Sequence, residues 1–170
     1  VGCRRITERF LSASDPPSGR DIEAARSFAR ESFSAAIAKE HILERGPVLL
    51  VVTGGTATNL VAIEKKLEPY DTTQVHCTML LRERVDALAA KLATLTVKER
   101  AALPGLQPKR APVILAGALA ISELMSQVRV GSLVVSESDL LFGLAICAGQ
   151  AAAKEESPLD WEPALSSLCA

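Results

Sequence analysis

The sequence predicts an α/β domain with a parallel core to its sheet. Two short apolar segments, residues 48–52 and 131–136, have the Val- and Leu-rich composition of buried strands. Each leads directly into residues that favour the start of a helix, and longer segments with helical periodicity lie between them. Alternation of strands and helices is typical of parallel strands joined by crossover helices.

Composition limits the possible partners of this chain. Its 170 residues, 48% hydrophobic and 23% charged, are enough for one domain with a buried core. A net charge of -1 and 4% aromatic residues argue against nucleic-acid binding. The longest apolar segments, residues 111–122 and 140–153, are shorter than the roughly 20 residues that span a bilayer, so we expect two buried helices. No signal-peptide core follows Val1, and we expect a cytoplasmic protein with no membrane partner.

The four cysteines, Cys3, Cys77, Cys147 and Cys169, form no C-x-x-C pair and have no histidine at ligand spacing. The sequence therefore predicts no metal site within this chain. Cys77 follows His76, but neighbours on an extended segment point to opposite faces, which argues against a nucleophile and its base. We interpret His76 as a hydrogen-bonded structural residue and the cysteines as reduced, packed thiols.

The N-terminal part is predicted to contain an extended segment over residues 1–7 and a turn-rich loop over residues 14–19. Ser18 and Asp21 have the spacing of a capping box, and a helix with one apolar face follows them. Residues 48–52 are apolar without alternation, which favours a parallel strand covered on both faces.

The middle of the chain begins with a short predicted helix over residues 57–66, followed by an extended segment over residues 74–80. An amphipathic helix with a stripe of apolar residues from 85 to 95 comes next. Thr96 and Glu99 form a second pair at capping-box spacing, which predicts another helix start.

The C-terminal part contains a break at residues 103–106 and then a segment, residues 109–128, that is apolar almost all round. Such a helix is expected at the centre of the domain. Ser136 with Asp139, and Glu137 between them, are predicted to cap a helix that begins near residue 138. A final short helix is predicted over residues 158–167.

A glycine pair joins the strand at residues 48–52 to the following helix, and it defines the candidate binding loop, the 54–58 loop. Its residues are Gly54, Gly55, Thr56, Ala57 and Thr58. Glycines permit positive φ and close approach of a ligand to the backbone. The free N–H groups and positive dipole end of the helix favour an anion, so a phosphate-bearing ligand is the natural occupant. A plain strand-to-helix connector has the same sequence features and stays open as the alternative.

Several segments together resemble a known family in their order and spacing. They are Arg5-Ile6-Thr7-Glu8-Arg9-Phe10, Gly54-Gly55-Thr56-Ala57-Thr58-Asn59-Leu60, Tyr70-Asp71, Val75-His76, Leu95-Thr96 with Glu99-Arg100, Leu103-Pro104-Gly105-Leu106, Arg110-Ala111, Val113-Ile114-Leu115-Ala116-Gly117-Ala118, and Val134-Val135-Ser136 with Gly143-Leu144. This set resembles the Ppx/GppA family, the exopolyphosphatases and guanosine pentaphosphate phosphohydrolases of the actin-like ATPase superfamily. The resemblance implies the ribonuclease H-like fold of the family's second domain, a mixed sheet with flanking helices.

Parts of the family pattern do not occur in these 170 residues. Family members carry a D-x-G-S-type loop and a catalytic glutamate in a first domain, and a G-G-G-S-T-E segment opens the second. The resemblance therefore implies that residues 1–154 are part of a second domain without its first hairpin, and that residues 155–170 are a C-terminal segment with a short helix. The strand at residues 48–52 would then have an unpaired edge, and we expect upstream residues or dimerisation to cover it.

The activity implied by the resemblance is hydrolysis of the terminal phosphoryl group of polyphosphate or guanosine pentaphosphate. It implies Mg²⁺ held by ligands outside this chain, and a homodimeric full-length protein. The 54–58 loop would bind phosphate or nucleotide through its backbone N–H groups. Arg110 is a possible substrate contact, although a solvated or interdomain side chain stays open. No catalytic residue is assigned in this chain, and we expect the 170 residues alone to be inactive.

Four departures from the family pattern leave other functions open. Cys77 stands where glycine is usual, Pro112 where an acidic residue is usual, Asp139 where glycine is usual, and Leu141-Phe142 where a polar pair is usual. A divergent, non-catalytic member that binds a phosphorylated ligand or a partner protein is the main alternative. A kinase or ATPase of the wider superfamily is the third.

Overall fold

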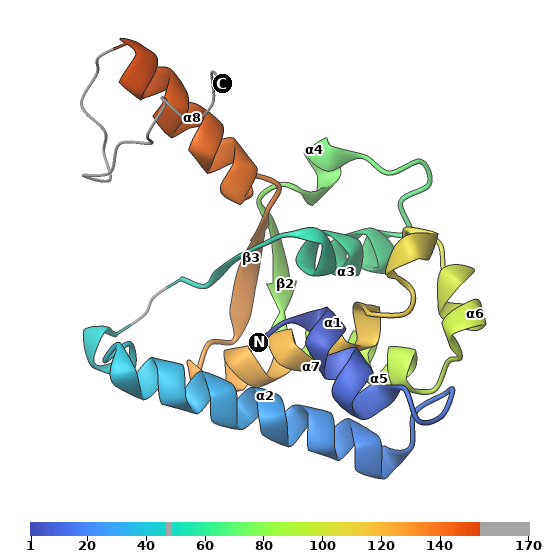
Figure 1. The fold of residues 1–170 in the computed structure, drawn as a ribbon. Coiled ribbons are helices and arrows are strands. Elements are labelled where there is room, and N and C mark those ends of the chain that lie inside the picture. Colours follow the sequence, from blue (N-terminus) through green and yellow to red (C-terminus); the bar gives the residue numbers. More distant parts are fainter. Residues whose placement is uncertain (47–48, 154–170) are drawn as a thin grey trace, which may run out of the picture. The chain divides into compact units, whose positions relative to one another are not determined.

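A computed structural model describes residues 1–46 and 49–153 of the chain (Figure 1). The chain divides into two compact units, Val1–Glu137 and a second that begins at Ser138. The first unit, called the core unit below, contains a three-stranded sheet and the helices that cover it. The described part of the second unit contains one helix, α8 (Leu140–Ala153).

The N-terminal segment is helical, so the prediction of an extended segment over residues 1–7 is wrong. Helix α1 (Cys3–Ile6) continues into a π-helical turn, η1 (Thr7–Leu11). Apolar residues recur at helical spacing through Ile6, which is fully buried, and Phe10. Arg4 and Glu8 form an i, i+4 ion pair, with 2.8 Å between Nε and Oε1. Seven residues are too few to reveal a helical period that continues to residue 11.

Helix α2 (Gly19–Lys39) confirms the first predicted cap. The Ser18 hydroxyl oxygen accepts a hydrogen bond from the Asp21 N–H at 3.2 Å. The helix ends at Lys39, and a 3₁₀ turn, η2 (Leu43–Arg45), follows it.

The sheet is mixed and has the order β1-β3-β2, with bounds β1 (Val51–Thr53), β2 (Thr78–Leu81) and β3 (Ser132–Ser136). Strands β1 and β3 are parallel, and β2 is antiparallel to β3. This arrangement confirms the predicted α/β class with a parallel pair. The segment predicted to be extended over residues 74–80 is a strand only in its second half, because helix α4 (Thr72–Val75) occupies the first.

The two faces of the sheet differ in burial. Leu133 and Val135 of β3 and Leu80 of β2 are buried under the helices, whereas Val51 is 49% exposed and Met79 is 60% exposed. The prediction of a strand covered on both faces is therefore wrong for β1. An apolar run without alternation does not prove double coverage when the strand is short. Strand β1 lies at an edge of the described sheet, as expected, while residues 47 and 48 fall outside the described residues.

Helix α7 (Ile114–Gln127) lies at the centre of the core unit, and helices α1, α2, α3 and α5 pack against it (Figure 1). Ten of its residues are buried, which confirms the predicted central helix. It begins at Ile114 instead of residue 109, because Pro108 opens a separate 3₁₀ turn. The remaining elements of this layer are α3 (Gly55–Lys65), α5 (Arg82–Ala93), α6 (Val97–Ala101) and η3 (Pro108–Arg110).

Two of these helices confirm local sequence signals. Helix α6 has a complete capping box, since Thr96 and Glu99 each accept a hydrogen bond from the other's backbone N–H. The amphipathic stripe of α5 is buried, as predicted, through Val85, Leu88 and Leu92.

Helix α8 is capped by Asp139, whose Oδ1 accepts from the N–H groups of Leu141 at 3.0 Å and Phe142 at 3.2 Å. The expectation that residues 140–153 form a buried helix is wrong, because most large side chains of α8 are exposed and only Cys147 is buried. An apolar segment of this length indicates a helix but not its surroundings. The helix predicted over residues 158–167 lies outside the described residues. Within residues 1–46 and 49–153, no helix is both long and apolar enough to cross a membrane.

Candidate functional site

The carboxyl ends of the two parallel strands meet at one edge of the sheet. Thr53 of β1 is paired in register with Ser136 of β3. The next residues, Gly54 and Glu137, therefore leave the sheet side by side. Gly54 has a φ of +89°, a conformation that favours glycine, and helix α3 begins at the following residue. Ligands of open α/β sheets commonly bind at such strand ends.

Arg110 lies directly against the 54–58 loop, so the structure brings two sequence-predicted site elements together. A Cβ atom added to Gly55 would overlap the Arg110 guanidinium. The Arg110 side chain is partly buried, and its Nε has no hydrogen-bond partner among the described residues. A buried, unsatisfied donor of this kind needs a partner from solvent, an ion or a ligand.

The other residues of the loop turn their side chains into the protein. Thr56 packs against Gly117 of α7, where an added Cβ would overlap the Thr56 side chain. Ala57 is 1% exposed and Thr58 is 6% exposed. The Thr58 N–H donates to the Gly54 carbonyl at 3.3 Å, so the groups that the loop could offer a ligand are the backbone N–H groups of its earlier residues. Their part in phosphate binding stays a prediction.

A hydrogen-bonded segment fixes Arg110 beside the loop. Asn59 of α3 donates from Nδ2 to the Gly55 carbonyl at 2.7 Å, and its Oδ1 accepts from the Gln107 N–H at 2.9 Å. Gln107 immediately precedes η3, which carries Arg110. Gly105, with a φ of +85°, allows this segment to approach α3, since a Cβ there would overlap the Ala62 carbonyl.

Tyr70, His76 and Glu137 form a polar cluster that the sequence reasoning missed. The Tyr70 hydroxyl donates to Glu137 Oε1, and the Glu137 N–H donates to His76 Nδ1 at 3.2 Å. Burial, followed by the hydrogen bond to Glu137, raises the pKa of Tyr70 to about 12. The hydrogen bond of His76 agrees with the structural role predicted for it. The position of Glu137 directly after a parallel strand was a signal for the site, but it was interpreted as a helix cap.

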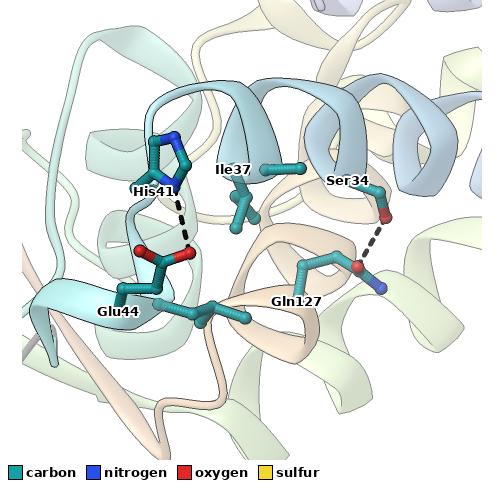
Figure 2. Close-up of a pocket in the computed structure, with 7 residues that line it drawn as sticks. Ser34, Ile37, His41, Glu44 and Gln127 are labelled. Carbon is teal, nitrogen blue, oxygen red and sulfur yellow. Dashed lines mark hydrogen bonds and ion pairs between the residues drawn. The ribbon is translucent and has the colours of Figure 1, made fainter.

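A separate pocket of about 280 Å³ lies between the ends of α2 and α7 (Figure 2). Its polar side chains pair with each other: Ser34 donates to Gln127 at 2.7 Å, and His41 Nδ1 lies 3.0 Å from Glu44 Oε1. None of the predicted site residues lines it. This pocket therefore does not belong to the candidate site.

The described residues do not fit a magnesium site. Across residues 1–46 and 49–153, no group of three or more His, Cys, Asp or Glu side chains is placed to hold a metal ion. The candidate site has one carboxylate, Glu137, and it accepts from Tyr70. We derive no step through a metal from these residues.

The model of the Ppx/GppA phosphatase family matches residues 1–145 of the chain. The chain belongs to the Ppx/GppA phosphatase family. Exopolyphosphatase 2 of Mycobacterium tuberculosis is 34% identical to it over 154 residues, which are 86% of this chain and 46% of that protein. The bifunctional 3-dehydroquinate synthase/phosphatase of Fusobacterium nucleatum is 30% identical over 95 residues, which are 55% of this chain and 14% of that protein. This Ppx/GppA chain thus spans about half the length of the mycobacterial relative.

Solved structures of the Ppx/GppA family have the same fold over about half of their own length. The Aquifex aeolicus family member matches with a TM-score of 0.80 and 24% identity, covering 92% of this chain and 48% of that one. An exopolyphosphatase-like protein matches with a TM-score of 0.80 and 27% identity, covering 89% of this chain and 49% of that one. The three-stranded mixed sheet and its helices therefore correspond to part of the Ppx/GppA fold.

Proposed function

We propose that this chain is part of a phosphatase that hydrolyses the terminal phosphoryl group of polyphosphate or guanosine pentaphosphate. Residues 1–154 would supply part of the second domain, and the water-activating carboxylate and the metal ligands would lie elsewhere in a homodimeric whole protein. Family membership and the similarity to a protein named Exopolyphosphatase 2 support the reaction class. By itself, the 170-residue chain is expected to release no phosphate from these substrates.

The contact between Arg110 and Gly55 is the observation that carries the proposal. The guanidinium lies at the start of α3, where the backbone N–H groups of the first turn have no helical acceptor. A bidentate cation and a helix N-terminus together suit a phosphate group. We assign Arg110 and the 54–58 loop a role in binding and orienting one end of the substrate. They would take no part in bond cleavage.

Titration calorimetry of the 170-residue chain with inorganic tripolyphosphate tests this assignment. Arg110→Gln removes the partly buried cation, and Lys109→Gln removes an exposed neighbouring charge as the matched control. Loss of a charge-assisted hydrogen bond of about 1.5–3 kcal/mol corresponds to a weakening of roughly tenfold to more than a hundredfold. We expect Lys109→Gln to weaken binding by about twofold at most. Equal effects of the two substitutions, or no binding by the wild-type chain, would reject the assignment.

A non-catalytic, partner-binding member is the second candidate function, and one observation favours it. Leu141 and Phe142, in place of a polar pair, are 71% and 57% exposed at the start of α8. Exposed apolar side chains at this position suit a protein contact better than a contact with a polyanion. Release of phosphate from tripolyphosphate by the whole protein would eliminate this candidate.

A further inference from the structure

We propose that Tyr70 and Glu137 are a positioning pair that fixes the Gly54–Gly55 turn in the geometry that binds the substrate. This inference rests on the proposed function, because it concerns the same loop. Neither side chain needs to touch the substrate. Both would act through the backbone of the 54–58 loop.

The segment from Tyr70 to Cys77 is attached to the end of β3 at three points. The Tyr70 hydroxyl donates to the Glu137 carboxylate, and His76 Nδ1 accepts from the Glu137 N–H at 3.2 Å. The Cys77 N–H donates to the Val135 carbonyl at 2.8 Å. Glu137 is thus held from both ends of the short helix α4, through its side chain at one end and its backbone at the other.

Tyr70 also contacts the first turn of helix α3. A hydrogen bond from the Thr58 hydroxyl lowers the pKa of Tyr70, against the larger effect of burial, so the two hydroxyl groups are neighbours. Thr58 is itself a member of the 54–58 loop and is 6% exposed. The phenol ring therefore connects the start of α3 with the end of β3.

The register of the sheet makes this connection relevant to the loop. Gly54 and Glu137 follow the paired residues Thr53 and Ser136, so the glycine turn and the carboxylate leave adjacent strands together. Glycine at a positive φ is intrinsically flexible. A bridge between the two strand ends restricts the direction in which the turn presents its N–H groups.

Positioning and plain electrostatics predict opposite effects for Glu137. A carboxylate beside a phosphate site repels the ligand, so its removal by electrostatics alone would tighten binding. In a positioning role, Glu137→Ala removes the acceptor of the Tyr70 hydroxyl and weakens binding. Glu137→Gln retains an acceptor oxygen without the charge and restores binding.

The experiment measures tripolyphosphate affinity of the 170-residue chain by calorimetry, and unfolding by denaturant, for Tyr70→Phe, Glu137→Ala and Glu137→Gln. We expect Tyr70→Phe and Glu137→Ala to weaken binding by about tenfold. Glu137→Gln keeps the acceptor and removes the repulsive charge, so it should bind at least as tightly as wild type. Glu68→Ala, which removes an exposed acidic side chain from the turn before Tyr70, is the matched control and should leave the affinity unchanged. Unchanged affinity in Tyr70→Phe, or tighter binding in Glu137→Ala, would overturn the inference.

A ligand-free measurement separates this inference from the proposed function. The amide resonances of Gly54 and Gly55 should shift in Tyr70→Phe and stay in place in Glu68→Ala, as measured by nuclear magnetic resonance of the free chain. If wild type fails to bind tripolyphosphate although these resonances shift, the proposed function is wrong while the bridge to the loop stands. If wild type binds and the resonances do not shift, the positioning pair is wrong.

Discussion

Two acidic side chains of the core unit, Glu123 and Glu137, differ in the side chains that their carboxylates contact. Glu123 of α7 has a side chain only 8% exposed and is paired with two arginines of α2, Arg26 at 2.9 Å and Arg30 at 3.1 Å. Glu137 is partly buried at the end of β3 and receives a hydrogen bond from the neutral Tyr70 hydroxyl. The first carboxylate is paired with two cationic side chains where helices pack, and the second is hydrogen-bonded to an uncharged side chain beside the candidate site.

The surroundings of Glu123 explain why that charge is tolerated. The adjacent Ser122 donates to Asp86 of α5 at 2.5 Å and accepts from Arg26 at 3.3 Å. These bonds connect α2, α5 and α7, the three helices that form the main packing layer. A buried charge in such a network stabilises the fold only while its partners are present.

The largest effect on stability is therefore expected from Glu123→Ala. It leaves Arg26, which is 24% exposed, without its carboxylate, and we expect a loss of about 2–3 kcal/mol in the free energy of unfolding. Denaturant unfolding measures this loss. Glu23→Ala is the control, because the exposed Glu23–Arg30 pair at 3.7 Å should contribute less than about 0.5 kcal/mol. Equal losses in both variants would contradict the contrast between a buried network and a surface pair.

A smaller effect should appear at Tyr70 at alkaline pH. The folded-state pKa of about 12 lies above the ordinary tyrosine value of 10.0. A raised folded pKa means that the unfolded chain releases this proton first, so the stability from Tyr70 is fully present below about pH 10 and is lost as the pH rises toward 12. The difference in unfolding free energy between wild type and Tyr70→Phe should shrink across that range. Tyr70 is the one tyrosine of the chain, so ultraviolet absorbance reports its ionisation directly.

Local signals of the fold were readable in the sequence, and contacts between distant residues were not. The cap at Ser18 and the capping box at Thr96–Glu99 each join residues three apart, so their pattern alone predicts the helix start. The parallel character of the sheet followed from composition and alternation with helices, whereas the pairing of β1 with β3 did not. Helix α1 cannot be predicted from residues 1–7 alone, because its apolar period continues from Ile6 to Phe10.

In the candidate site, too, local features could be predicted from the sequence and contacts between distant residues could not. The glycine turn was recognisable because its chemistry lies in five consecutive residues. The approach of Arg110 to Gly55 and the bond between Tyr70 and Glu137, which are 67 residues apart, depend on packing. No periodicity or spacing rule encodes which partly buried hydroxyl meets which carboxylate.

The smallest expected effect lies at Cys77, next to the Tyr70–Glu137 cluster. Its φ of +60° is in the left-handed region, which disfavours a residue with a Cβ, and its N–H is fixed by the Val135 carbonyl. Cys77→Gly should raise the unfolding free energy by about 1 kcal/mol, whereas Cys77→Ala should give no gain because it keeps the Cβ. Denaturant unfolding compares the two variants. A gain in Cys77→Ala equal to that in Cys77→Gly would place the effect in the thiol instead of the backbone.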